Sequence, residues 1–530
     1  MAEQRFELDI TPNLGMNTAV NAAQLPQGAH RLAMNACMKS IGTIGKRPGS
    51  APVTDNSVSS NLGYITAYKV SPSDTEPVLL AADGTTLYKY TPNTLTAQNM
   101  TNAFVANRVF GAAFTDAFDN SRLLLTDGGN LKEYNGAEVK NVTPAANDPD
   151  PAPPNDLTAI NGKGPRYIWV HTGHVFLSAG TDLVWYSKRY NYNYFPSVQY
   201  FRFVRENDYI TGPGITFANL CLIPMRRGWG VITGEVFNDG AVSNGFSANQ
   251  YLNTANGSIA ERGVTKITYP NGLQTIAYLS DDGVHEIYDT GFEGDGVRQY
   301  STRSLMREKI DFAKYGFTEG ELRAAVAVFD GAHSRLIVSI SRDNTHYAFV
   351  LDTRNGEWYV WTFPLKVTAM GMFDEQLYFA NTGGRLNRFE ETLTSDWHDR
   401  GKTNGSPVDM TIATGLINLE FTGEQSYLHY FLVESAMWGV KSSLDITIVY
   451  GAGAMQLDQT IRNEVFVWDV TAWAQGQWAN VHYTDSLNNA KRKVIHKKAK
   501  YFQIILRNNR DEPVTILRYK LEGTVTGIGG

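Results

Sequence analysis

Ser280-Asp281-Asp282-Gly283-Val284-His285-Glu286-Ile287-Tyr288 is the clearest copy of a short unit that recurs along this chain. The unit joins a tight Asp-Gly turn, whose glycine tolerates a positive φ, to alternating apolar positions typical of a half-buried strand. The same layout appears at 83–90 and 127–134, and looser versions appear at 180–186 and 383–389. Successive copies, allowing for one degraded copy, lie roughly 40 to 60 residues apart, which is the period of β-propeller blades. The repeat therefore predicts an all-β protein that contains a propeller.

Composition agrees with this fold class and excludes several functions. The 530 residues suggest more than one domain, and 48 glycines against 12 methionines favour strands joined by turns. The net charge of −6 is small for this length, so there is no global basic field for nucleic acid. Cys37 and Cys221 lie far apart without metal-ligand spacing, which argues against a disulfide-stapled secreted fold. We expect no secretory leader, because the start has no apolar run behind a basic segment. We expect no membrane span, because no apolar run approaches the roughly 20 residues that a membrane helix needs.

Strand-turn-strand patterns between 61 and 400 predict a propeller of six to eight blades, with seven preferred. One blade can be drawn completely, from four consecutive strands at 324–329, 335–341, 347–352 and 357–362. The poorest blade lies around 215–236, and 304–312 is the best helix candidate after the N-terminal segment. The pattern changes near 397–407, and long alternating strands follow at 407–417, 425–436, 444–450, 464–469, 501–508 and 514–524. We therefore expect a C-terminal antiparallel β-sandwich over 401–530.

The first 60 residues differ from the rest, and we expect an extended arm with a short helix within 29–39. This segment reads Gly15-Met16-Asn17, then Leu25-Pro26-Gln27-Gly28, then an Asn-containing stretch, and then Gly42-Thr43-Ile44-Gly45-Lys46-Arg47-Pro48-Gly49. The order resembles the opening of tailed-bacteriophage tail proteins, including the nozzle proteins that close short tails. In those openings the Lys-Arg-Pro-Gly corner leads into the first propeller strand. A propeller followed by a terminal β domain ending in 501–509 is also similar to phage tail proteins.

The resemblance implies a structural component of a phage tail, in the nozzle or at the tail-tube tip. It implies a homo-oligomeric ring around the DNA exit channel, attached to neighbouring tail or adaptor proteins. Viral DNA would pass through the channel without sequence-specific binding. The location would be the virion tail, after assembly in the host bacterial cytoplasm, and the protein would not be an enzyme. No invariant motif in the middle of the chain contributes to the resemblance.

Three segments are candidate interface or gate elements. The most aromatic one, 188–203, could stack on a sugar, form an interface, or simply fill the packing between blades. The proline-rich stretch 147–154 cannot pair as a central strand. The basic run 491–500 could contact phosphate, acidic lipopolysaccharide or an acidic partner surface, or could be a solvated strand edge whose lysines discourage pairing. The candidate residues are Tyr190, Tyr192, Tyr194, Phe195, Tyr200, Pro151, Pro153, Pro154, Lys491, Arg492, Lys493, Lys497 and Lys498. The Gly- and Asn-rich stretch 238–258 is a further candidate loop.

Catalytic and metal sites are not expected. Asp281, Asp282 and Glu286 lie close together, but a glycosidase needs two carboxylates held about 5 to 10 Å apart, and an Asp pair is also usual in a hairpin turn. His171 and His174 are three residues apart, but in a strand-turn-strand context we expect that spacing not to place them on one face. Gly-x-Ser-x-Gly, the Walker pattern and an EF-hand loop are missing. The alternatives are a receptor-binding or polysaccharide-degrading tail protein and a cellular propeller scaffold.

Overall fold

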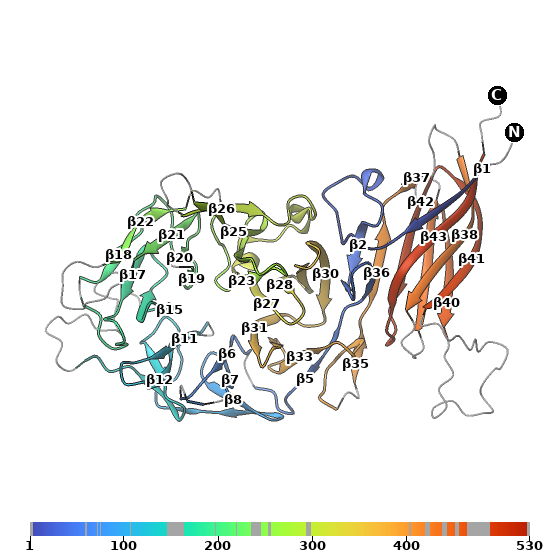
Figure 1. Ribbon diagram of the computed structural model, residues 1–530. Coiled ribbons are helices and arrows are strands. Elements are labelled where there is room, and N and C mark those ends of the chain that lie inside the picture. The colour runs from blue at the N-terminus through green and yellow to red at the C-terminus, as the bar shows by residue number, and fades with distance from the viewer. Residues whose placement is uncertain are drawn as a thin grey trace.

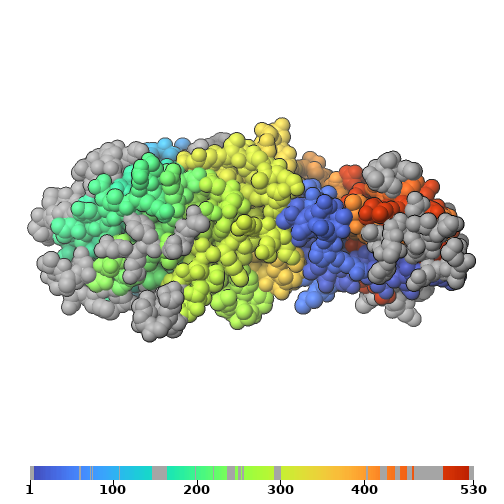
Figure 2. All heavy atoms as spheres, turned by 90° about the horizontal axis from the view of Figure 1, so that it is seen from above, coloured from blue at the N-terminus to red at the C-terminus, as the bar shows by residue number. Residues whose placement is uncertain are grey.

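The computed structural model describes all residues except 1–3, 59–60, 72, 75, 107, 146–163, 197, 219, 235–244, 253–255, 293–297, 402–403, 419–424, 437–441, 451–454, 464–487 and 527–530. The described chain is almost entirely β structure. It forms a disc of sheets around a central axis and a second β domain beside the disc (Figure 1). Seen on edge, the two parts make one flat, elongated body (Figure 2).

Successive antiparallel sheets radiate from the axis, and each begins with its innermost strand. The innermost strands contact one another around the axis. β31 (Val367–Phe373) contacts β6 (Tyr64–Tyr68) and β27 (Val326–Asp330), β11 (Phe110–Thr115) contacts β15 (Tyr167–His171), and β23 (Val264–Thr268) contacts β27. The sheets are β6 (Tyr64–Tyr68), β7 (Val78–Ala82), β8 (Leu87–Thr91) and β9 (Thr94–Ala97); β11 (Phe110–Thr115), β12 (Ser121–Thr126), β13 (Lys132–Tyr134) and β14 (Glu138–Asn141), with β10 (Asn99–Met100) at its edge; and β15 (Tyr167–His171), β16 (His174–Ser178), β17 (Leu183–Tyr186) and β18 (Tyr200–Arg202). This arrangement is that of a β-propeller.

The same order continues around the disc. The next sheets are β19 (Ile215–Phe217), β20 (Leu220–Pro224), β21 (Trp229–Thr233) and β22 (Ser247–Tyr251); β23 (Val264–Thr268), β24 (Gln274–Ser280), β25 (Gly283–Phe292) and β26 (Arg298–Ser304); β27 (Val326–Asp330), β28 (Arg335–Arg342), β29 (Thr345–Asp352) and β30 (Glu357–Phe363); and β31 (Val367–Phe373), β32 (Gln376–Asn381) and β33 (Leu386–Glu390). Ser280–Tyr288 contains the hairpin between β24 and β25, where Ser280 pairs with Gly283 and Gly283 has a φ of +123°.

The N-terminal segment joins the sheets of both parts. β1 (Gln4–Ile10), β3 (Ala36–Met38) and β4 (Ile44–Lys46) belong to a sheet of the terminal domain. β5 (Gly49–Pro52) pairs with β33 and so supplies the outer strand of the last propeller sheet. β2 (His30–Met34) lies between β30 of the propeller and β36 (Met410–Thr414) of the terminal domain. One sheet therefore runs from the propeller axis into the terminal domain without a break.

The terminal domain contains two sheets of long strands. One has the order β3-β4-β43-β38-β41, with β1 also on β43, and the other continues from β2 through β36, β42, β39 and β40. In β42 alternate side chains are buried, as expected of a strand with one face on a core. The bounds are β34 (Ser395–Trp397), β35 (Gly405–Pro407), β36 (Met410–Thr414), β37 (Ile417–Asn418), β38 (Gln425–Ala436), β39 (Ser442–Tyr450), β40 (Met455–Asn463), β41 (Asn488–Ala499), β42 (Tyr501–Asn508) and β43 (Thr515–Thr526). The strand expected at 464–469 lies outside the described residues.

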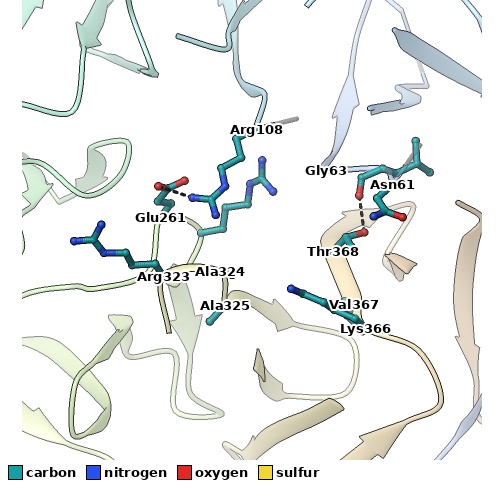
Figure 3. Close-up of a pocket in the computed structure, with 12 residues that line it drawn as sticks. Asn61, Gly63, Arg108, Glu261, Arg323, Ala324, Ala325, Lys366, Val367 and Thr368 are labelled. Atoms are coloured by element: carbon teal, nitrogen blue, oxygen red, sulfur yellow. Dashed lines mark hydrogen bonds and ion pairs between the residues drawn. The ribbon is translucent and has the colours of Figure 1, made fainter. Parts of the chain in front are cut away.

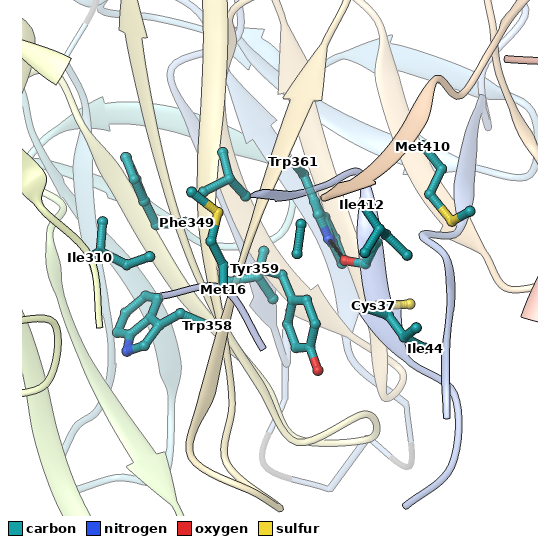
Figure 4. Close-up of a cluster of buried hydrophobic side chains, with 14 of the residues drawn as sticks. Met16, Cys37, Ile44, Ile310, Phe349, Trp358, Tyr359, Trp361, Met410 and Ile412 are labelled. Carbon is teal, nitrogen blue, oxygen red and sulfur yellow. Dashed lines mark hydrogen bonds between the residues drawn. The ribbon is translucent and has the colours of Figure 1, made fainter. Parts of the chain in front are cut away.

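A single hydrophobic cluster extends across the junction between the two parts. It joins Phe349 and Trp358 of the propeller to Ile44 of the N-terminal segment and Ile412 of the terminal domain (Figure 4). Trp361 is fully buried there, and its indole N–H donates to the carbonyl of Ala36 at 2.8 Å. Burial of large apolar side chains from both sides stabilises the junction.

Two helix predictions are wrong. Residues 29–39 form β2 and β3 around Asn35, whose φ is +53°, because pairing with β36 outweighs local propensity; the nearest helix is the short 3₁₀ turn η1 (Ala22–Gln24). The stretch 304–312 makes one turn, in which the N–H of Ile310 donates to the carbonyl of Met306, and then leaves it. Two short helices follow, η2 (Phe312–Tyr315) and α2 (Glu319–Arg323).

Candidate functional site

The Lys46-Arg47-Pro48-Gly49 corner is the joint between the propeller and the terminal domain. Lys46 and Arg47 are almost completely buried. Lys46 Nζ donates to Asn508 Oδ1 at 2.5 Å and to the carbonyl of Arg510 at 2.6 Å, both in the terminal domain. Burial lowers the pKa of Lys46 to about 8, while the charges of Asp511 and Glu512 act in the opposite direction. The corner leads directly into β5, which is the first propeller strand in sequence and closes the last propeller sheet.

Arg47 connects three segments through one guanidinium. It forms a two-pronged ion pair with Asp396, at 3.0 and 2.5 Å, and donates to the propeller carbonyl of Thr362 at 2.8 Å. Its Nε donates to Asn35 Oδ1 at 3.1 Å. Close backbone packing leaves no room for a side chain at either glycine of the corner. A Cβ on Gly49 would lie 2.1 Å from the Ser395 carbonyl oxygen, and a Cβ on Gly45 would lie 2.6 Å from the Val514 carbonyl oxygen. The motif therefore has a structural role.

A second site lies at one end of the propeller axis, where the innermost strands begin. A basic residue comes shortly before the innermost strand in several sheets: Arg108 before β11, Arg166 before β15, Arg262 before β23, Arg323 before β27 and Lys366 before β31. The innermost strands of a propeller run in the same direction, so residues that precede them gather at the same end of the axis. Arg108, Arg262, Arg323 and Lys366 all line one cavity of about 220 Å³, which we call the axial cavity.

Glu261 is the acidic residue in the lining of the axial cavity. Its carboxylate forms ion pairs with Arg108, at 2.8 Å, and with Arg166. In Figure 3 Arg108 and Lys366 extend toward the cavity from different sides, whereas the guanidinium of Arg323 points away from its centre. Arg323 instead pairs with Glu319 at 2.7 Å and contacts the hydroxyl of Tyr209. The lining therefore has more positive than negative charge.

Arg262 is the most enclosed cation of the axial cavity. Its guanidinium lies over the ring of Phe110, 5.0 Å from the ring centroid, and donates to the carbonyl of Val109 at 3.1 Å. Burial lowers its pKa to about 10; the carboxylate of Glu261 works against this shift and the charge of Arg108 adds to it. A guanidinium in these surroundings stays charged at neutral pH, so this end of the axis has a fixed positive charge.

A larger cavity of about 600 Å³ lies beside the axial cavity and shares Arg323 with it. Its lining includes Arg205, Arg226 and Arg227. Arg226 forms a two-pronged ion pair with Asp281, at 2.8 and 2.9 Å. The cavity is also lined by Asp281 and Glu319, so its four arginines exceed its acidic residues by two, and the excess of positive charge extends outward from the axis.

The predicted aromatic residues lie in and beside the connection between β17 and β18. Phe195 is buried, and Tyr192 packs on Phe114 with the Arg122 guanidinium 4.8 Å from its ring centroid. Lys188 lies over the ring of Tyr194 at 4.5 Å. Tyr190 and Tyr200 are 46% and 47% exposed. The segment therefore both fills packing between sheets and presents an apolar surface.

The other predicted interface residues are only partly described. Pro151, Pro153 and Pro154 lie outside the described residues, as do 238–244 and 253–255. The prediction of a loop over 238–258 is wrong for Ser247–Tyr251, which form β22 because they pair with β21. Lys491, Arg492, Lys493, Lys497 and Lys498 belong to β41, which stands at the end of its sheet and pairs with β38. Lys498 is exposed, and Lys497 Nζ lies 5.6 Å from the centroid of the Tyr450 ring.

The acidic residues of the 280–288 stretch have separate structural partners. Asp281 binds Arg226, whereas Asp282 accepts from Asn256 at 3.1 Å and lies 2.7 Å from His285 Nε2. Glu286 is fully buried and accepts from Tyr269 and Thr275, at 2.8 and 2.9 Å. Asp281 and Asp282 form the turn of the β24–β25 hairpin, as their sequence pattern predicted.

The expectation that His171 and His174 lie on different faces is wrong. They are cross-strand partners at the end of the β15–β16 hairpin, and partners in an antiparallel pair point to the same face. Both rings are buried, 6.1 and 5.2 Å from that of Phe246. His171 Nδ1 is 3.0 Å from Thr216 Oγ1, and burial lowers its pKa to about 4, with a further contribution from His174. Across the described part of the chain, no three His, Cys, Asp or Glu side chains come together as metal ligands.

Sequence reasoning missed the axial cavity. Each of its cations is unremarkable alone, and the useful signal was positional: a basic residue shortly before the innermost strand, repeated from sheet to sheet. Reading that signal requires knowing which strand of each sheet is innermost.

None of the helices in the described residues is long and apolar enough to cross a membrane.

The strand pairing and the ring of innermost strands define an all-β protein with a β-propeller. No protein-family model and no curated protein matches the sequence. Among solved structures, virginiamycin B lyase from Staphylococcus aureus has 9% sequence identity and a TM-score of 0.40, over 64% of this chain and 98% of that chain. BamB from Moraxella catarrhalis has 12% identity and a TM-score of 0.34, over 74% and 98%. The designed protein Ika8 has 11% identity and a TM-score of 0.34, over 64% and 99%. Scores this low do not bear on function.

Proposed function

We propose that this protein is a structural, non-enzymatic subunit of a bacteriophage tail, in the nozzle or at the tail-tube tip. Identical subunits form a ring around the DNA exit channel, contact neighbouring tail or adaptor proteins, and take part in tail assembly and in DNA retention and ejection. DNA passes without sequence-specific contacts, and the small net charge of −6 suits a channel that does not hold it strongly. The protein belongs to the virion tail and is assembled in the host cytoplasm.

The observation that carries this proposal is the position of the Lys46-Arg47-Pro48-Gly49 corner, the motif that resembles those of phage tail proteins. Lys46 and Arg47 are buried at the junction, and their hydrogen bonds hold the terminal domain and the propeller together. A motif used in this way maintains a fixed angle between two parts of one rigid body. A ring subunit needs that rigidity, because small changes of angle in each copy would prevent the ring from closing.

We also propose the finer architecture that this function uses. The sheets beginning with β6, β11, β15, β19, β23, β27 and β31 are the blades of a seven-bladed propeller, in which β5 completes the last blade. The two sheets of the terminal domain form a sandwich with Phe431 and Ile504 in its core. The rigid disc supplies loop-bearing surfaces on all sides for contacts with neighbours.

An apolar surface on the outer edge of the propeller supports subunit contact. Among the described residues, the large exposed hydrophobic side chains include Tyr190, Val198, Tyr200 and Val204, which follow one another closely in sequence. In Figure 1 β18, to which Tyr200 belongs, lies at the far side of the disc from the terminal domain. Apolar surface on the side away from the terminal domain suits a head-to-tail contact between neighbours in a ring.

The test is electron microscopy of the purified full-length protein, with mass measurement in solution. A closed ring with an axial channel wider than a DNA duplex is the expected result. Isolated monomers at high concentration, or fibre-like trimers, would contradict the proposal. Trimers that bind or degrade a host polysaccharide would favour the receptor-binding alternative.

Substitutions in the exposed apolar surface test whether it forms the contact between subunits of the ring. The double variant Tyr190→Ser with Tyr200→Ser should shift the population from rings to monomers that keep the circular dichroism spectrum of the wild type. Leu273→Ser is the matched control, because it removes an exposed apolar side chain from a hairpin in another sheet. If both variants form rings equally well, the contact does not use this surface.

A further inference from the structure

The positive charge at the axial cavity comes from a repeated arrangement. Arg108, Arg262, Arg323 and Lys366 come from the starts of different sheets, far apart in sequence, and they meet only because the innermost strands begin at one end of the axis. Bringing like charges together in a confined space costs free energy unless a counter-charge is present. Glu261 supplies part of that counter-charge, but it already serves both Arg108 and Arg166.

Two of the cations have capacity for an additional anion. In the part of the chain that the structure describes, no carboxylate lies within 4.0 Å of Lys366 Nζ or of the Arg262 guanidinium. The bond from Arg262 to the Val109 carbonyl uses one of the five N–H groups of the side chain. Figure 3 shows Lys366 reaching toward the space that Arg108 faces.

The chemistry of these donors selects one class of ligand. A guanidinium presents parallel N–H groups that match two oxygens of a phosphate or carboxylate, and an ammonium adds a point charge. The Phe110 ring below Arg262 holds the guanidinium in place before a ligand arrives, so little side-chain entropy is lost on binding. A cavity of about 220 Å³ has room for a compact anion but not for a large one.

We propose that the axial cavity binds a compact oxyanion, a phosphate- or carboxylate-bearing small molecule, between Arg262 and Lys366 with Arg108 at its rim. This site is separate from the ring interface and does not depend on the proposed role in a tail. A bound anion neutralises the end of the axis and links the starts of the sheets that begin with β11, β23 and β31. The protein should therefore become more heat-stable when the site is filled.

The experiment is calorimetric titration of the full-length protein with sodium phosphate and with citrate, at an ionic strength held constant with chloride. We expect saturable binding of one anion per chain and a rise in melting temperature that chloride alone does not produce. Binding that is non-saturable, or equal for chloride and phosphate, would overturn the proposal. A short single-stranded oligonucleotide is titrated in parallel. If it binds and phosphate neither binds nor competes, the surface is a nucleic-acid contact and the proposal is wrong.

Variants that should change the phosphate affinity in opposite directions distinguish a ligand-binding role of the axial cavity from a purely structural role. Lys366→Gln should weaken phosphate binding about tenfold, the usual effect of losing one charge-assisted hydrogen bond. Lys498→Gln removes one exposed lysine of the terminal domain and should leave the affinity unchanged. Glu261→Gln releases Arg108 and Arg166 from their carboxylate and should tighten phosphate binding. Melting curves without ligand show whether each variant is folded. Unchanged affinity in a folded Lys366→Gln variant would overturn the proposal.

Discussion

At the residue scale, we expect substitution of Arg47 to lower the free energy of unfolding strongly. Its ion pair with Asp396 is buried, with 1% and 7% of the two side chains exposed. Arg47→Lys keeps the charge but cannot form the two-pronged pair and also reach Thr362 and Asn35. We expect a loss of about 3 kcal/mol in the free energy of unfolding, because the Asp396 carboxylate would stay buried without its two-pronged ion pair.

Chemical denaturation of the Arg47→Lys variant measures this loss. Arg400→Lys is the control, since Arg400 and its partner Asp55 are 41% and 65% exposed. An exposed pair contributes about 0 to 1 kcal/mol, so this variant should be nearly as stable as the wild type. Equal losses in the two variants would show that burial of Arg47 is not what makes it important.

The burial of His30 should make the stability of the protein fall at acid pH. The residue is fully buried, and burial lowers its pKa from 6.5 to about 4, although bonds to the backbone at Leu14 and Gly15 act in the opposite direction. The unfolded chain therefore binds more protons than the folded chain between these two values. Stability is fully present above pH 6.5 and is lost as the pH falls toward 4, by about 2 kcal/mol at pH 5 for this group.

Urea unfolding of the wild type and of His30→Gln at neutral pH and near pH 5 tests this dependence. The variant starts less stable at neutral pH, but its additional loss near pH 5 should be about 2 kcal/mol smaller than that of the wild type. His398→Gln, which removes an exposed imidazole, should keep the wild-type loss. A pH dependence in His30→Gln equal to that of the wild type would contradict the prediction.

At the element scale, β5 depends on a glycine. The N–H of Gly49 donates to the Leu393 carbonyl at 2.8 Å, and a Cβ would lie 2.1 Å from the Ser395 carbonyl oxygen. Gly49→Ala should therefore push β5 away from β34 and weaken closure of the last sheet. We expect a fall in melting temperature of several degrees, and faster proteolysis within 386–400.

Gly320→Ala is the matched control for this prediction. A Cβ on Gly320 would meet nothing within 4 Å, and the residue lies in α2. Alanine is better than glycine in a helix by up to about 1 kcal/mol, so this variant should be as stable as the wild type or more stable. A Gly49→Ala variant that is as stable as Gly320→Ala would show that β5 can shift at little cost.

Elements with local signals were predictable, and elements set by distant partners were not. The β24–β25 hairpin and the four strands from β27 to β30 follow from turn residues and alternation. The strands β2 and β3 were mistaken for a helix, because the pairing that fixes β2 comes from β36, which lies far along the chain. The relation between His171 and His174 was missed because it depends on the register of a hairpin, and the axial cavity was missed because it depends on closure of the whole disc.

At the scale of the whole molecule, the shared sheet should make unfolding cooperative. The sheet order β30-β2-β36-β42 and the shared hydrophobic cluster couple the two parts across their junction. We expect one calorimetric transition for the full chain. Ile504→Ala, which opens a cavity in the terminal domain, should move that transition as a whole to lower temperature. Two separated transitions would contradict the prediction.

The pairing of β1 and β4 with β43 has a consequence for synthesis. In the backbone pairing Gln4 is opposite Val525, and Ile44 is opposite Ile516. β1 and β4 are synthesised early, so they can form these pairs only after β43 has been made. A ribosome adds roughly 5 to 20 residues each second, and contacts this far apart in sequence form slowly. During that interval the early strands have exposed edges, and a prematurely ended polypeptide could not cover them. The sheet that contains β1 and β4 can therefore close only after translation has passed β43.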